Sequence, residues 1–508
     1  MSSDSTISEL LASGGESSVA IAAPDARLLT YAGLRSQVAR TVDLLNGFGV
    51  GRNDRVAIVL PNGPEMAVAF VATAAGATAA PLNPAYRAEE FEFYLSDLRA
   101  KALIVEHGSQ SPAPSVAARL GIRVLELKPT PELGAGTFEL ASAPKDPGAS
   151  APGGFAEAED IALVLHTSGT TSRPKLVPLS QRNIAASARN IRATLKLAPE
   201  DCGLAIMPLF HIHGLMASLL APLSAGSRVF CTPSFNALKF FAWMSAARPT
   251  WYTAVPTMHQ AILARAAHNR EVIAANPLRF IRSSSSSMPP QVIQELEATF
   301  NAPLIESYGM TEASHQMTSN PLPPGQRLRG TVGVAAGPEV AIMGERGNLL
   351  PPGQMGEIVI RGESVTQGFE NNPEANADAF IDGWFRTGDQ GIMSADGYIS
   401  ITGRLKEIIN RGGEKISPRE VDEVLMDHPA IQQVVTFAVP HPKLGEDVAA
   451  AVVLCEGAEL TEKEVREFAA RRLADFKVPR KVLFLPEIPK GATGKLQRIG
   501  LAAKLGLA

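Results

Sequence analysis

Residues 165–175 read Leu165-His166-Thr167-Ser168-Gly169-Thr170-Thr171-Ser172-Arg173-Pro174-Lys175 and begin at the end of the apolar run 161–165. An apolar run that ends in a polar, glycine-containing segment predicts a buried strand that runs into a loop. Gly169 would let the backbone approach an anion closely, and Lys175 would supply positive charge, while hydroxyls and turn amides donate to phosphate oxygens. The stretch therefore predicts a phosphate-binding loop at the end of a strand.

The Walker loop is the best-known alternative, and it requires the pattern G-x-x-x-x-G-K-[ST]. Here Pro174 precedes Lys175 and Leu176 follows it, so the sequence lacks both the glycine before the lysine and the hydroxyl after it. Clusters of Ser, Thr and Gly are also common in plain polar surface loops. Taken alone, the stretch leaves a phosphate loop of another type and a surface loop as alternatives.

Composition excludes several classes of function. A chain of 508 residues with 45% hydrophobic and 19% charged residues is expected to form roughly two to four domains. A net charge of -4 gives no basic surplus, so we expect no nucleic-acid partner. The three cysteines, Cys202, Cys231 and Cys455, have no metal-site or disulfide spacing, which favours a reducing, cytoplasmic location.

The sequence also gives no sign of a membrane or secretion signal. The N-terminal segment 1–15 lacks a basic region followed by an apolar one, and apolar runs are interrupted before they reach the length of a bilayer span. We therefore expect no membrane partner, and no obligate protein partner is indicated.

Strand and helix patterns alternate along the first third of the chain. Apolar residues recur at helical spacing over 30–51, and apolar strand-like runs follow at 55–60, 102–105 and 123–125. Such alternation predicts a large α/β domain with buried parallel strands. The Pro/Gly/Ala/Ser-rich segment 129–154 is predicted to be a loop or linker.

Two further strand-to-loop junctions resemble the one at residue 165. Strand-like residues 280–282 enter the serine run 283–287, and residues 304–308 enter 309–312. Ligands of open α/β sheets collect at the carboxyl ends of the strands, so we expect the three junctions to share one site.

The sequence beyond residue 324 predicts a small β-rich subdomain and then a separate α+β domain. A hairpin turn is expected at 345–348 and an alternating strand at 357–361, and the glycine-dotted, charged segment 403–415 is typical of a hinge. Ser417 is expected to cap a helix that starts at Pro418, with Glu420 completing a capping box. The last domain would contain strands 433–439, 448–454 and 481–485 and helix 461–473. We therefore predict domains at residues 1–403 and 404–508, with the second one mobile.

Five ordered motifs together resemble the adenylate-forming superfamily of acyl-CoA synthetases, adenylation domains and luciferases. The resemblance covers nearly the whole chain and departs from the family pattern at Ser172 and Leu176, where the phosphate loop of the family usually has glycine. The motifs are residues 167–171 with Lys175, 308–312, 383–389, 403–407 and 489–495.

The resemblance implies an ATP-dependent acid–CoA ligase, with ATP and Mg²⁺ used in a first half-reaction and CoA in a second. It implies that ATP and AMP are bound by Thr167, Ser168, Gly169, Thr170, Thr171, Lys175, Glu306, Tyr308, Asp389 and Arg404. It implies catalytic roles for Thr311 at the α-phosphate, for Glu312 as the Mg²⁺ ligand, for Lys406 at the hinge and for Lys495 in adenylation. Gly412 and Gly413 would let the pantetheine arm of CoA pass close to the backbone.

At finer grain, several long segments are similar to the oxalate–CoA ligase branch, namely 79–97, 208–215, 249–260, 308–321 and 409–421. Imidazoles and hydroxyls would suit a small acid with a second carboxylate or another polar group, because a buried anion must be paired and hydrogen-bonded. We expect the acid to contact His211, Ser285, His315 and His213.

Alternatives remain open at the level of the sequence. His213 could equally be a structural histidine, because a spacing of two places it beside His211 in an extended segment but not in a helix. The substrate could be another small polar or aromatic acid. The chain could also be a stand-alone adenylation module that loads a carrier protein, or an AMP sensor without catalysis.

Overall fold

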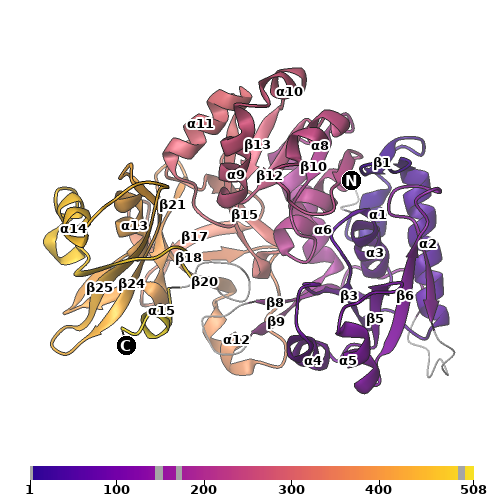
Figure 1. Ribbon diagram of the computed structural model, residues 1–508. Coiled ribbons are helices and arrows are strands. Elements are labelled where there is room, and N and C mark those ends of the chain that lie inside the picture. Colours follow the sequence, from indigo (N-terminus) through magenta and orange to yellow (C-terminus); the bar gives the residue numbers. More distant parts are fainter. Residues whose placement is uncertain (1–3, 143–152, 168–173, 490–497, 508) are drawn as a thin grey trace. The chain divides into compact units, whose positions relative to one another are not determined.

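The computed structural model describes residues 4–142, 153–167, 174–489 and 498–507 (Figure 1). The chain forms two compact units. The first comprises Met1–Thr167, Lys175–Val340 and Ile360–Phe385, and the second comprises Ser168–Pro174, Ala341–Val359 and Arg386–Ala508. The domain boundary predicted at residues 403 and 404 stays a prediction.

The larger sheet of the first unit has nine strands in the order β16-β15-β14-β13-β12-β10-β11-β1-β2. The central strands from β14 to β1 are parallel, and the pairs at either end are antiparallel. The strands are β1 (Val19–Ala22), β2 (Leu29–Thr30), β10 (Cys202–Ala205), β11 (Arg228–Cys231), β12 (Trp251–Ala254), β13 (Phe280–Ser283), β14 (Leu304–Met310), β15 (His315–Ser319) and β16 (Val334–Ala335).

The second sheet of this unit has seven strands in the order β7-β6-β5-β3-β4-β8-β9, again with a parallel centre and antiparallel edges. The prediction of a loop over 129–154 is wrong for the edge strand β7, because Phe138 and Leu140 alternate into the core. The strands are β3 (Arg55–Val59), β4 (Thr78–Pro81), β5 (Ala102–Glu106), β6 (Arg123–Pro129), β7 (Phe138–Ser142), β8 (Ile161–Thr167) and β9 (Lys175–Ser180).

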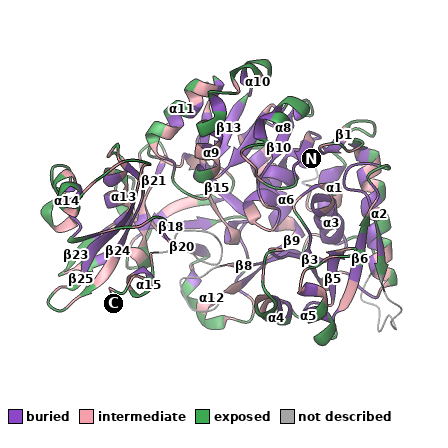
Figure 2. Ribbon diagram, in the orientation of Figure 1, coloured by how far each residue is buried: buried purple, intermediate pink, exposed green. Residues whose placement is uncertain are grey.

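Helices cover both faces of each sheet because successive strand residues are apolar on both sides. In β3, Val56 and Ile58 pack in the core that contains α2 and α3, whereas Ala57 and Val59 pack in the core that contains α4 and α5. Strands of the nine-stranded sheet likewise divide their side chains between the core with α6 and the core with α8, α9 and α11. Figure 2 shows buried strands and exposed outer helix faces, as this double burial requires.

The helices begin where the sequence provides caps. The Thr30 hydroxyl accepts from the Gly33 amide at the start of α2, and the Ser180 hydroxyl accepts from Asn183 at the start of α6. The helices of the first unit are α1 (Ile7–Leu11), α2 (Tyr31–Gly47), α3 (Pro64–Ala74), α4 (Ala88–Asp97), α5 (Ala113–Arg119), α6 (Gln181–Thr194), the π-helix η1 (Gly214–Leu220), α7 (Ala221–Ser224), α8 (Phe240–Ala247), α9 (Pro256–Ala266), α10 (Arg270–Ala275), α11 (Pro290–Phe300), the 3-10 helix η2 (Thr311–Ala313) and α12 (Pro373–Ala379).

The later part of the chain contains two five-stranded sheets, one of β17 to β21 and one in the order β23-β22-β25-β24 with β26 on β25. The α+β pattern predicted after residue 417 is confirmed. The strands are β17 (Glu339–Met343), β18 (Met355–Arg361), β19 (Phe380–Ile381), β20 (Trp384–Met393), β21 (Ile399–Arg404), β22 (Ile409–Arg411), β23 (Glu414–Ile416), β24 (Ile431–His441), β25 (Gly445–Leu454) and β26 (Lys481–Phe484). The helices are η3 (Leu405–Glu407), α13 (Pro418–Met426), α14 (Glu462–Ala470), η4 (Asp475–Lys477) and α15 (Leu501–Lys504).

One predicted detail of this region is wrong. Ser417 is the N-cap residue of α13 and Pro418 its first residue, but the Ser417 side chain does not cap the helix. Its hydroxyl instead donates to the Thr402 carbonyl of β21, so the predicted capping box with Glu420 is absent. Within the parts of the chain that the structure describes, no helix is long and apolar enough to cross a membrane.

Candidate active site

The predicted phosphate loop connects two antiparallel neighbours, β8 and β9. Thr167 and Lys175 are opposite each other across this pair of strands. The predicted phosphate-binding residues Ser168, Gly169, Thr170 and Thr171 lie outside the described residues. A Walker loop leads from a strand into a helix, whereas this connection leads from β8 into the antiparallel strand β9. This difference agrees with the absence of the Walker pattern from the sequence. The Lys175 ammonium lies 4.3 Å from the centroid of the Phe369 ring, a cation–π contact that holds its side chain.

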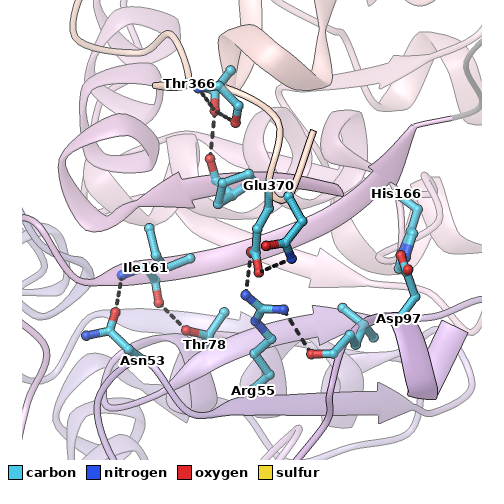
Figure 3. A network of polar contacts seen from close by, with 12 residues as sticks. Asn53, Arg55, Thr78, Asp97, Ile161, His166, Thr366 and Glu370 are labelled. Carbon is cyan, nitrogen blue, oxygen red and sulfur yellow. Dashed lines mark hydrogen bonds and ion pairs between the residues drawn. The ribbon is translucent and has the colours of Figure 1, made fainter. Parts of the chain in front are cut away.

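Polar contacts fix the stem of this connection (Figure 3). Glu370 donates its amide to the Leu176 carbonyl over 3.1 Å, and its carboxylate is paired with the Arg55 guanidinium. Arg55 in turn donates to the Leu98 carbonyl over 2.9 Å. Leu176 of β9 is therefore linked through Glu370 and Arg55 to strand β3 and to the end of α4.

His166, the residue before Thr167, is held from the other side. Its Nε2 atom lies 3.1 Å from Asp97, and its ring meets Tyr94 edge to face with centroids 4.6 Å apart. Burial lowers the pKa of His166, against the opposing effect of the Asp97 hydrogen bond. Both strands of the stem are thus anchored before they reach the residues predicted to bind phosphate.

Thr366 joins this stem to another predicted junction. Its hydroxyl donates to the Pro178 carbonyl of β9 over 2.8 Å (Figure 3). Its amide donates to the Glu312 carbonyl over 2.8 Å. Glu312 and Thr311 form η2 at the end of β14, and the Glu312 side chain is buried. Thr366 links β9 to η2, a connection that sequence reasoning missed because both of its partners are distant in the chain.

The other two junctions lie side by side, as predicted. Strands β13 and β14 are parallel neighbours with Ser283 opposite Glu306, and the Ser284 hydroxyl donates to the Ser307 carbonyl over 3.0 Å. Glu306 and Tyr308 are half-buried residues of β14. The bulge after Tyr308 requires glycine at 309, because a Cβ there would lie 1.9 Å from the His315 carbonyl oxygen.

A buried polar cluster follows at the same end of the sheet. His213 is 2% exposed, with its Nδ1 atom 3.0 Å from the Ser285 hydroxyl and its Nε2 atom 2.7 Å from the Thr253 hydroxyl. The His213 and His315 rings are stacked with centroids 4.8 Å apart. The structure thus brings together three of the four residues predicted to contact the acid.

His211 occupies the same turn but a different environment. His213 has helical backbone angles at the start of η1, so the two histidines do not share the face that an extended segment would give them. His211 is half-buried, and its ring lies 4.6 Å from that of Phe210. Its predicted contact with the acid stays a prediction.

The backbone around this cluster is held in an unusual conformation. Ser285, Ser314 and His315 have φ angles of 73°, 50° and 94°, a region that residues other than glycine rarely adopt. Such conformations persist only where the surrounding structure enforces them, and they are frequent at functional sites.

Arg282 is the charged residue of this cluster, and sequence reasoning assigned it no role. It lies in strand β13, one residue before the strand ends at Ser283, with 0% exposure, and it hydrogen-bonds to Thr253 and to Gln316, each over 3.3 Å. Burial lowers the pKa of the Arg282 guanidinium to about 9. The sequence shows a charged residue after the apolar pair Phe280-Ile281, but its role depends on partners that are distant in the chain.

The second unit contains another predicted pair. Asp389 and Arg404 are opposite each other across β20 and β21, and Arg404 Nε lies 3.0 Å from Asp389 Oδ1. The Asp389 side chain is largely buried, whereas that of Arg404 is 41% exposed. An aligned carboxylate beside a guanidinium can accept hydrogen bonds from neighbouring hydroxyl groups.

The residues predicted to form the hinge and the CoA passage follow this pair closely in sequence. Lys406 is in η3, directly after β21. Gly412 and Gly413 form the tight hairpin turn between β22 and β23, with φ angles of 61° and 99°. Because glycine adopts such positive φ angles without strain, the turn itself explains glycine at both positions. Lys495 lies outside the described residues.

Comparisons with known proteins identify the family of the chain. The model of the family described as AMP-binding enzyme matches residues 12–369, and that of the AMP-binding enzyme C-terminal domain matches residues 420–495. The chain is 48% identical to a probable CoA ligase, CCL9, of Humulus lupulus (92% of this chain, 90% of that protein). It is 45% identical to an oxalate–CoA ligase of Arabidopsis thaliana, with 92% of each chain covered. The solved structure of ATP-bound MatB from Rhodopseudomonas palustris superimposes with a TM-score of 0.87 at 29% identity, covering 99% of each chain. The chain therefore belongs to the AMP-binding enzyme family.

Proposed function

We propose that this protein is an ATP-dependent oxalate–CoA ligase, which forms oxalyl-AMP and pyrophosphate and then oxalyl-CoA and AMP. The observation that carries the proposal is the polar cluster formed by the buried His213 and His315 with the partly buried Ser285 at the end of the sheet. The similarity to an oxalate–CoA ligase over 92% of both chains supports the choice of acid. A pocket for a fatty acid would be lined mainly by apolar side chains.

In the first half-reaction, one carboxylate oxygen of the acid attacks the α-phosphorus of ATP, and the bond to the β-phosphate oxygen breaks. Both reactants are anions, so groups that neutralise negative charge are needed where they meet. We assign Lys175 and residues 167–171 to the leaving pyrophosphate and Thr311 to the α-phosphate. Lys495 would stabilise the charge that develops during adenylation.

The nucleoside part of ATP would be held by two further groups. Glu306 and Tyr308 would lie beside adenine. Asp389 would accept hydrogen bonds from the ribose hydroxyls, and Arg404 would orient the Asp389 carboxylate through the 3.0 Å ion pair.

Mg²⁺ belongs to the proposal through Glu312. Among the described residues, no group of three or more His, Cys, Asp or Glu side chains could hold a metal ion. Mg²⁺ in nucleotide sites is commonly bound by one or two carboxylates together with substrate phosphates, so the single carboxylate of Glu312 fits that mode. When bound, the ion would supply positive charge to the phosphate oxygens.

In the second half-reaction, the thiol sulfur of CoA attacks the acyl carbon of oxalyl-AMP, the carbon–oxygen bond to AMP breaks, and AMP leaves. CoA is long and enters after pyrophosphate has left, so we assign Lys406 to a hinge between the two half-reactions. Gly412 and Gly413 would leave room for the pantetheine arm.

The second carboxylate of oxalate accounts for the polar character of the acid site. Ser285 and His315 would hydrogen-bond to it, with His211 at the edge of the site. His213 is a buried, hydrogen-bonded side chain, so we place it behind Ser285 and give it a supporting role.

Pyrophosphate release measured with a panel of acids tests the proposal. Oxalate should give the highest kcat/KM, with acetate, medium-chain acids and benzoate far lower. Turnover of an aromatic or medium-chain acid without turnover of oxalate would reject oxalate while retaining adenylation. Acid-dependent exchange of pyrophosphate into ATP without any CoA product would instead favour a module that loads a carrier protein.

A further inference from the structure

Arg282 is a buried cation whose hydrogen-bonding partners are not acids. Its Nη1 atom lies 3.3 Å from Thr253 Oγ1 and 3.4 Å from His213 Nε2, and its Nη2 atom lies 3.3 Å from Gln316 Oε1. No carboxylate pairs with Arg282 in the described part of the chain, where its Nε atom also has no partner. Buried charges are normally paired, so an uncompensated guanidinium here requires an explanation.

Gln316 fixes the orientation of the guanidinium. The Gln316 amide nitrogen donates to Thr194 over 3.1 Å and to the Ala336 carbonyl over 3.0 Å, which directs its Oε1 atom toward Arg282. Arg282 is therefore held as a donor on two sides, with Nη1 directed at Thr253 and His213.

The directions of the remaining hydrogen bonds follow from this arrangement. A guanidinium can only donate, so the Thr253 oxygen accepts from Arg282. The Thr253 hydroxyl proton is then available to donate to His213 Nε2. A proton on Nε2 would face the Arg282 N–H group at 3.4 Å, donor against donor. The ring proton of His213 therefore lies on Nδ1, and Nδ1–H donates to the Ser285 oxygen over 3.0 Å.

The last member of this chain of hydrogen bonds faces a different environment. Ser285 is only partly buried, and its φ angle of 73° holds it at the bend after β13. Because its oxygen accepts from His213, its hydroxyl proton is free to donate outward to an anion. In this chain of hydrogen bonds, each group therefore donates to the next, from the buried Arg282 guanidinium to the Ser285 hydroxyl.

We propose that Arg282 is the positioning residue of the acid site: through Thr253 it fixes the neutral Nδ1–H form of His213, so that Ser285 donates to the acid. Its charge also favours acids that carry a second negative group over monocarboxylates. This inference rests on the proposed function and adds to it a residue that selects dianionic acids. Burial that disfavours the charged guanidinium agrees with a site that is completed by an anion.

Two variants test the chain of contacts through kinetics. Arg282→Gln removes the charge, and Thr253→Val removes only the bridging hydroxyl at nearly constant volume. Loss of one charge-assisted hydrogen bond corresponds to about 10- to 100-fold, so each variant should raise the KM for oxalate within that range. The KM for ATP should stay within about twofold, and Arg282→Lys should recover part of the loss through its charge.

Arg279→Gln is the matched control, because Arg279 lies in the preceding loop and is paired with Asp201 at 2.8 Å. It should lower the unfolding temperature without changing the ratio of oxalate to acetate turnover. Equal increases in the KM for oxalate and ATP, or an unchanged KM for oxalate in Thr253→Val, would overturn the inference.

A measurement of the tautomer separates this inference from the proposed substrate. In the ¹⁵N-histidine spectrum of the full-length protein, the His213 signals, identified by their absence in His213→Gln, should show a neutral ring protonated on Nδ1. Thr253→Val should shift this pattern toward a mixture of tautomers. An Nε2–H ring in the wild-type protein would refute the role of Arg282 whatever acid is used, whereas an inactive wild type with oxalate would reject only the substrate.

Discussion

The His213 and His315 rings are stacked, with centroids 4.8 Å apart and ring planes inclined by 18°. One ring lies at the start of the π-helix η1, and the other begins the antiparallel strand β15 beyond the bulge of β14. Two segments far apart in sequence thus form one wall of the cluster that also contains Ser285.

His315→Ala is expected to weaken binding of the acid much more than binding of ATP. Loss of one hydrogen bond to a charged group corresponds to about a tenfold or greater rise in the KM for oxalate, with the KM for ATP within about twofold. The exposed His268 offers the control His268→Ala, which should leave both constants unchanged. If His315→Ala raised both KM values equally, His315 would not belong to the acid site.

Asp389→Asn is expected to raise the KM for ATP by about tenfold, because an amide replaces a carboxylate oxygen that can accept from ribose hydroxyls. The KM for oxalate should change little. Glu339→Gln alters an ion pair with Arg361 whose members are both exposed, and it serves as the control. An ATP dependence that is the same in Asp389→Asn and in the wild type would remove Asp389 from the nucleotide site.

Lys495→Ala is expected to separate the two half-reactions. Removal of a charge that stabilises the transition state costs about 10²- to 10³-fold in rate, and the loss should fall on pyrophosphate release. Thioester formation from supplied oxalyl-AMP should remain within a few-fold of the wild type. Lys481→Ala, at an exposed residue of β26, is the control. Equal losses in both half-reactions would contradict the role of Lys495.

His259 is expected to make the first unit less stable in mild acid. Burial lowers its pKa from 6.5 to about 4, and its Nδ1 atom hydrogen-bonds to the Tyr252 hydroxyl over 3.2 Å. The unfolded chain therefore binds a proton first as the pH falls. The contribution of His259 to stability is complete above pH 6.5 and is lost as the pH falls toward 4.

Urea unfolding at pH 7.5 and pH 5 measures this effect. Between these values the wild type should lose about 2 kcal/mol more than His259→Gln, which carries no titrating group at this position. Identical pH dependence in the two proteins would show that His259 is not held neutral by burial.

Much of the fold followed from local patterns in the sequence. Buried strands such as 55–59 and 102–106, and the helix 31–47, are determined by apolar runs and spacings that are visible locally. Strand β7 escaped prediction because its proline- and glycine-rich surroundings conceal a short alternating edge strand. The capping box at Ser417 failed because a carbonyl of β21 competes for the same hydroxyl.

The site was predictable where a strand ends and a polar run begins. The rule that ligands gather at the carboxyl ends of strands predicted that the junctions after 280–282 and 304–308 lie together, and β13 and β14 are parallel neighbours. That they share one binding site stays a prediction. Arg282, Thr253 and Thr366 could not be assigned, because each acts through partners that only the folded chain brings near. The spacing of His211 and His213 left their faces undetermined until the start of η1 was known.

Formation of oxalyl-CoA from isotopically labelled oxalate, followed by mass spectrometry, tests the proposed reaction. Labelled oxalyl-CoA, AMP and pyrophosphate should form in equal amounts, and only when ATP, Mg²⁺ and CoA are all present. Oxalate should also outcompete acetate, malonate and benzoate at equal concentration. Absence of labelled thioester, with ready conversion of one of the other acids, would contradict the account.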